Sequence, residues 1–157
     1  MTMNSIAKVP SRRLTPTFSI MLIDDNKDFI EFLKFLLSHH GYDVYSAHSG
    51  PEGLAKLRTH PVDLVILDVM MPKMSGLEVC AEIRRMNSSL PVILLTAKDD
   101  LATRSAAIAL GASEFIAKPV NIDDLLTRVG TQCHVSEWDK SIESVMKATE
   151  QAAEAKS

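Results

Sequence analysis

Three short apolar runs along the chain each end at a polar residue. They are residues 18–23 before Asp24 and Asp25, residues 62–67 before Asp68, and residues 91–95 before Thr96. Runs this short, rich in Val and Ile and without alternation, are typical of strands that are covered on both faces. Two weaker runs of the same kind, at 43–47 and 113–117, bring the predicted strands to five.

Helical patterns separate the predicted strands. Apolar residues recur at three-and-four spacing in the first of them, and Gly41 follows as a natural C-cap. The predicted helices are 27–40, 51–60, 76–86, 101–110 and 122–129. A strand-helix order repeated along the chain predicts an α/β fold with a five-stranded, parallel, doubly wound sheet and helices on both faces.

In such a sheet the site lies beyond the carboxyl ends of the strands. We therefore expect the polar residues that end or follow the strands to converge on one edge. They are Asp24, Asp25, Asp68, Thr96 and Lys118.

The pattern changes beyond Gly130. Ser136 and Asp139 form a weak capping arrangement, which predicts an extra C-terminal helix running to about residue 155. Its apolar stripe consists of Trp138, Ile142, Val145, Thr149 and Ala152. We expect the stripe to pack on its own domain rather than on a partner helix. The predicted regions are a flexible N-terminal arm at 1–17, a domain at 18–130 and a helical extension at 131–157.

Length and composition favour one globular domain. The chain has 157 residues, of which 46% are hydrophobic and 24% charged, enough apolar surface for a single core. Its net charge of −3 argues against a nucleic-acid surface. Cys80 and Cys133 lie far apart and suit a reducing compartment better than a disulfide or zinc site. Without a secretory signal or an apolar run of roughly 20 residues, the sequence predicts a cytoplasmic protein without membrane attachment.

The polar strand ends suggest phosphoryl chemistry. Three carboxylates at one site repel one another unless a cation is present. Magnesium prefers one or two carboxylates, waters and a phosphate oxygen, whereas zinc prefers His or Cys. Lys118 and Thr96 add a positive charge and a hydroxyl donor that would stabilise a phosphoryl group. An Asp in this setting can be a nucleophile that forms an aspartyl-phosphate.

Four sequence elements together resemble the receiver domain of bacterial two-component response regulators. They are Asp24-Asp25, LDVMMPKMSG at residues 67–76, Leu95-Thr96-Ala97 and Lys118-Pro119. The resemblance covers about residues 18–130. It implies the flavodoxin-like strand order 2-1-3-4-5 and a cis bond between Lys118 and Pro119.

The resemblance also implies a role for each acidic residue. Asp68 is expected to be the phosphoacceptor. Asp25 and Asp68 are expected to bind Mg²⁺ directly, Asp24 through water, and the backbone carbonyl of Met70 to complete the protein ligands.

Further roles follow from the same resemblance. Thr96 and Lys118 are expected to contact the phosphoryl group, and Phe115 to rotate inward when Thr96 moves. Phe115 stands where chemotaxis-type receivers commonly have Tyr, so a switch through a phenolic hydroxyl is excluded. The implied partners are a histidine kinase or phosphotransfer protein and a downstream effector, with homodimerisation left open and no direct DNA binding.

Two other functions lack residues that they require. A haloacid-dehalogenase-type phosphatase needs a second Asp two residues after its nucleophile, but Met70 stands there, so a turnover enzyme is not expected. A nucleotide-binding protein needs a glycine-rich loop after the first strand, which is absent. A receiver-like module that binds partners without phosphorylation stays open. No output segment is expected after residue 130, and the C-terminal helix is a candidate to cover the surface that reads out phosphorylation.

Overall fold

The computed structural model describes residues 17–97 and 100–156, with the side chains of 136–140 and 154–156 left aside. The predicted N-terminal arm lies almost wholly outside the described residues. The strands are β1 (Ser19–Ile23), β2 (Asp43–Ala47), β3 (Leu64–Asp68), β4 (Val92–Thr96) and β5 (Glu114–Ala117). The helices are α2 (Lys27–His39), α3 (Gly50–Thr59), α4 (Gly76–Met86), α5 (Leu101–Ala109) and α6 (Ile122–Lys156).

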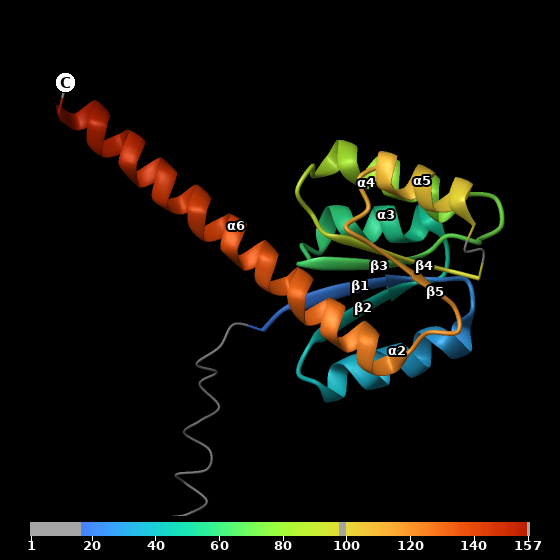
Figure 1. Cartoon of the computed structure of the whole chain (residues 1–157). Coiled ribbons are helices and arrows are strands. Elements are labelled where there is room, and N and C mark those ends of the chain that lie inside the picture. The colour runs from blue at the N-terminus through green and yellow to red at the C-terminus, as the bar shows by residue number, and fades with distance from the viewer. Residues whose placement is uncertain (1–16, 98–99, 157) are drawn as a thin grey trace, which may run out of the picture.

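The strands form one parallel sheet in the order β2-β1-β3-β4-β5. This order confirms the predicted fold class. Helices α3, α4 and α5 cover one face, while α2 and the first turns of α6 cover the other (Figure 1). The three central strands are therefore buried on both sides, which explains why their sequences are apolar without alternation.

Alternate residues of each strand face opposite cores. Along β1, Met21 and Ile23 belong to the core under α3, α4 and α5, while Ile20 and Leu22 belong to the core under α2 and α6. Residues with polar side chains cap the helices. Asn26, Ser49, Ser75 and Asp100 each accept a hydrogen bond from a backbone N–H in the first turn, which satisfies donors that the helix leaves unpaired.

Both cysteines are buried and free. Cys80 lies in α4 and Cys133 in α6. Burial raises the pKa of the Cys133 thiol to about 12. The thiol is therefore protonated at neutral pH and is a poor nucleophile.

The C-terminal segment corrects one detail of the prediction. The expected helices at 122–129 and 136–155 are one continuous helix, α6, of 35 residues. Gly130 does not end it, because a lone glycine inside a helix costs only about 1 kcal/mol. Among described residues, no helix is long and apolar enough to cross a membrane.

The expectation that the C-terminal stripe packs on its own domain is wrong for Ile142, Val145, Thr149 and Ala152, while the side chain of Trp138 lies outside the described residues. All residues from 141 to 153 are exposed, and α6 runs away from the sheet (Figure 1). A straight continuation of the helix past Cys133 carries the stripe beyond the edge of the domain. For the same reason these residues do not cover the surface around α5 and β5.

Candidate functional site

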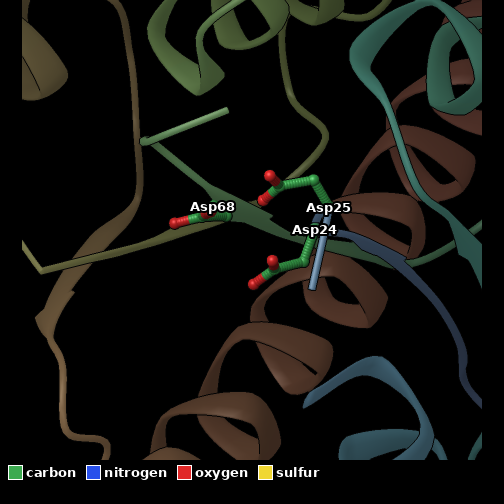
Figure 2. A group of neighbouring side chains, drawn as sticks. All are labelled: Asp24, Asp25 and Asp68. Carbon is green, nitrogen blue, oxygen red and sulfur yellow. The ribbon is translucent and has the colours of Figure 1, made fainter. Parts of the chain in front are cut away.

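The three acidic residues meet at the carboxyl edge of the sheet. Ile23 of β1 is the register partner of Leu67 of β3, so the residues that follow them, Asp24 and Asp68, lie side by side. Asp25 joins them from the loop after β1 (Figure 2). One carboxylate oxygen from each lies within 4.8 Å of the others. The prediction that these residues converge is confirmed.

Burial distinguishes the three carboxyl groups. Asp24 and Asp68 are 4% and 5% exposed, whereas Asp25 is exposed to solvent. Asp24 Oδ1 accepts a hydrogen bond of 2.9 Å from the Asn26 backbone N–H. Asp68 Oδ1 accepts a longer one of 3.4 Å from the Met70 backbone N–H. The carboxyl group of Asp68 is thus held only weakly by the backbone.

Lys118 brings the positive charge of the site. Its Nζ lies 3.1 Å from Asp24 Oδ2 and 3.4 Å from Asp68 Oδ1. The Lys118–Pro119 bond is cis, as predicted, and the Lys118 N–H donates to the Thr96 carbonyl at 2.7 Å. The Lys118 Nζ also lies 4.6 Å from the centre of the Phe29 ring, so α2 supports the ammonium group from below.

The charges at this edge do not balance. Burial raises the pKa of Asp68, and the neighbouring Asp24 raises it further, while Lys118 and the Met70 N–H lower it. Three carboxylates and one ammonium group leave an excess of two negative charges when all are ionised. A hard divalent cation with oxygen ligands fits that excess and that donor set, as Mg²⁺ does. Asp25, the exposed member, leaves the cluster open to solvent.

The loop after β3 folds tightly against the strand end. The Gly76 N–H donates to the Val69 carbonyl at 2.9 Å. A Cβ atom at Gly76 would lie 2.1 Å from the Asp68 carbonyl oxygen, so only glycine fits there. Within the same loop Lys73 adopts a φ of 69°, a left-handed conformation that is uncommon outside glycine. The backbone that carries Asp68 is therefore closely confined by its own loop.

Thr96 and Phe115 lie on β4 and β5, the two strands on the β3 side of the acidic cluster. Thr96 ends β4 and is fully buried, and Phe115 lies in the middle of β5, where its half-buried ring packs against the core. The guanidinium carbon of Arg104 in α5 lies 5.0 Å from the centre of the Phe115 ring. Met70, predicted to offer its carbonyl to the metal, follows the site with an exposed side chain.

Sequence reasoning missed three contributors to this site. Phe29 and Arg104 hold Lys118 and Phe115 through ring contacts between elements distant in the chain, and no local pattern marks such pairs. Gly76 was part of the quoted motif, but its close approach to the Asp68 backbone shows only in the structure.

Comparison with known proteins decides the family. The family model described as the response regulator receiver domain matches residues 20–130. The chain belongs to this family. The response regulator ArlR of Staphylococcus aureus is 39% identical over 110 residues, which are 70% of this chain and 50% of that protein. The receiver chain therefore spans about half the length of the curated relatives it matches.

Solved structures of receivers have the same fold. A CheY-like receiver domain protein from Methanospirillum hungatei is 27% identical with a TM-score of 0.76, over 79% of this chain and 99% of that one. TrrA from Thermotoga maritima, solved in complex with Mg²⁺ and BeF, is 37% identical with a TM-score of 0.68, over 74% of this chain and 99% of that one.

Proposed function

We propose that this receiver accepts a phosphoryl group on Asp68 from a histidine kinase or phosphotransfer protein, in a Mg²⁺-dependent reaction. It then signals through protein contacts that change with phosphorylation. The observation that carries this proposal is the convergence of Asp24, Asp25 and Asp68 with the ammonium group of Lys118 at one sheet edge. The Mg²⁺ and BeF bound in the TrrA structure support it.

The reaction follows from the placement of Asp68. An oxygen of its ionised carboxylate attacks the phosphorus of the donor, a P–O bond forms, and the bond from phosphorus to the donor's imidazole nitrogen breaks. The product is an acyl phosphate on Asp68 and a free histidine on the donor. Lys118 lies close enough to Asp68 to pair with an oxygen of the incoming group.

Asp24, Asp25, Asp68 and the Met70 carbonyl are the proposed metal ligands, Asp24 acting through water. Bound Mg²⁺ would supply charge neutralisation for the transferring phosphoryl oxygens. Asp25 suits direct ligation because it is the exposed member of the cluster. Lys118 now pairs with both buried carboxylates and would turn one of those contacts toward the phosphoryl group.

Readout is proposed on the surface formed by α5, β5 and the start of α6. The Thr96 hydroxyl would donate to a phosphoryl oxygen, and the shift of Thr96 would leave room for Phe115 to rotate inward. Arg104 holds the Phe115 ring in its present position, so the rotation must break that contact. The phosphoryl group can bias this switch only by favouring one arrangement energetically over the other. Domain organisation and the absence of a turnover activity stay predictions.

The test is phosphorylation by acetyl phosphate, followed by intact-protein mass spectrometry. We expect a mass gain of one phosphoryl group in the presence of Mg²⁺, none in EDTA, and none in Asp68→Asn with Mg²⁺. Asp43→Asn is the matched control, because Asp43 is an exposed residue at the opposite end of the sheet.

Labelling of Asp68→Asn at the wild-type level would move the acceptor elsewhere. Failure of the wild-type protein to label, despite a native circular dichroism spectrum, would favour the alternative of a partner-binding module that acts without phosphorylation.

A further inference from the structure

Helix α6 has two parts with different surroundings. In its first turns Leu125, Val129 and Cys133 are fully buried against the sheet. From Val135 onward the described side chains are exposed, and the helix extends into solvent (Figure 1). Residues 135–156, called the tail helix below, span about 33 Å at 1.5 Å per residue.

The tail helix has an apolar seam with a coiled-coil period. Val135, Ile142 and Thr149 are seven apart, and Trp138, Val145 and Ala152 repeat the interval three residues later. This alternation of three and four residues is the a and d spacing of heptads. Ile142 is 46% exposed and Val145 is 65% exposed, so the seam has no cover within the described part of the chain.

Charged residues of the tail helix avoid the a and d positions up to Ala152. Six of the eight take heptad positions b, c and f, and they are Glu137, Lys140, Glu143, Lys147, Glu150 and Glu154; Asp139 is at e, and Lys156, at the last a position, ends the helix. The g positions are Ser141, Ala148 and Ala155, and the e positions are Asp139, Met146 and Ala153. A free solvated helix has no physical reason to segregate charge in this way.

The occupant that fits this seam is the same helix from a second chain. In a parallel homodimer each g residue faces an e residue of the partner, so several charges of one sign at these positions would repel. Here Asp139 is the single charge at those positions. The small residues at g let two helices approach closely.

The a positions set the number and direction of helices. Three of the four a positions carry β-branched residues, Val135, Ile142 and Thr149, a type common at the a positions of parallel dimers, and Lys156 occupies the fourth. An antiparallel pair would place Ala152 opposite Val135. The end of each helix would then lie beside the part of the partner helix that contacts the sheet, where the receiver domain leaves less room. We propose that the tail helices of two copies of this chain form a parallel two-stranded coiled coil.

This association needs no phosphorylation, so its test is independent of the function proposed above. Sedimentation equilibrium of the full chain, without Mg²⁺ or phosphodonor, is expected to show a dimer. Ile142→Lys places two like charges in the seam and should weaken the dimer by about tenfold or more. Glu143→Lys, one residue away at a b position, is the matched control and should leave the dissociation constant within about twofold.

Direction is tested by a cysteine at the far end of the seam. Ala152→Cys should give a disulfide-linked dimer on mild oxidation, since equivalent d residues meet in a parallel pair. In an antiparallel pair the two sulfur atoms would be about 25 Å apart. Ser144→Cys, at an outward c position, should not link, and the native cysteines are buried.

A monomer at tens of micromolar, or a dimer that persists in Ile142→Lys, would overturn the proposal. Failure of Ala152→Cys to link would overturn the parallel arrangement. Circular dichroism and thermal melting of Ile142→Lys check the receiver fold, because the substitution lies outside it.

Discussion

The lack of space at Gly76 is the tightest structural constraint on the backbone of Asp68. A larger residue at this position is therefore expected to lower the stability of the protein. In Gly76→Ala the new Cβ would meet the Asp68 carbonyl oxygen at 2.1 Å and the Val69 Cα at 2.7 Å. Both are backbone atoms, so no side chain can rotate away to relieve the contact. Overpacking of a rigid site costs about 1–3 kcal/mol, and the upper end applies here.

The alanine also gains helix propensity, which offsets at most about 1 kcal/mol of that cost. The net effect is a loss of about 2 kcal/mol in the free energy of unfolding. For a chain of this size it corresponds to a melting temperature lower by about 4–8 °C. Because the displaced atom belongs to Asp68, we also expect slower labelling by acetyl phosphate.

Gly130→Ala is the matched control. Gly130 also lies in a helix, but a Cβ there would meet only the Tyr42 hydroxyl, at 4.0 Å. Without a clash the helix-propensity gain remains, about 1 kcal/mol, so this variant should melt about 2–4 °C higher than wild type. Urea unfolding of the three proteins measures the difference. Equal stability of Gly76→Ala and wild type would refute the packing argument.

Three further predictions concern the site. Mg²⁺ at 100 times its dissociation constant should raise the free energy of unfolding by about 2.7 kcal/mol; a melting temperature indifferent to Mg²⁺, or a rise retained in Asp25→Asn, would contradict the metal site. Burial raises the pKa of Asp68 in the folded protein. The contribution of this carboxyl group to the free energy of unfolding is therefore greatest below its ordinary pKa and is lost as pH rises through the raised pKa. Without metal, Asp68→Asn should therefore exceed wild type in stability at pH 7, with a margin that shrinks toward pH 4 in urea titrations; equal margins at both pH values would refute this. Phe29→Leu removes the ring beneath Lys118 and should slow labelling about two- to fivefold, the equivalent of about 0.5–1 kcal/mol, while Phe32→Leu, an exposed change on the same helix, should not.

The acidic site was predictable because it depends on chain topology. An apolar run that ends in Asp marks the carboxyl end of a buried strand, and parallel strands place all such ends on one edge. Asp24, Asp68 and Lys118 therefore meet although 94 residues separate the first from the last. The contact between the Phe29 ring and Lys118 was not predictable, because it depends on where α2 lies over the sheet.

The C-terminal helix shows the opposite case. Gly130 and the polar residues after it resemble a helix end, yet α6 continues because Leu125, Val129 and Cys133 anchor it on both sides of the glycine. Periodicity did reveal the apolar seam beyond it. Periodicity alone does not say whether a seam packs on its own domain, since that depends on the direction in which the helix leaves the sheet.

Helix α6 also joins the two proposals, because it is continuous from the readout surface to the tail. Arg128 of α6 pairs with Glu114, the neighbour of Phe115 in β5, and with Asp124 in its own helix. If Phe115 moves on phosphorylation, this pair carries the shift into α6 and so into the coiled coil. Half-exposed ion pairs contribute about 0–1 kcal/mol, so the dimer dissociation constant should change by at most about fivefold on phosphorylation.

By linkage, dimerisation must change the phosphorylation equilibrium by the same factor. Arg128→Gln should abolish the difference between the phosphorylated and unphosphorylated dissociation constants, measured by sedimentation equilibrium. Lys147→Gln, a charge change on the outward face of the tail helix, should preserve it. A difference that survives in Arg128→Gln would show that the coupling runs through contacts other than the Glu114 pair.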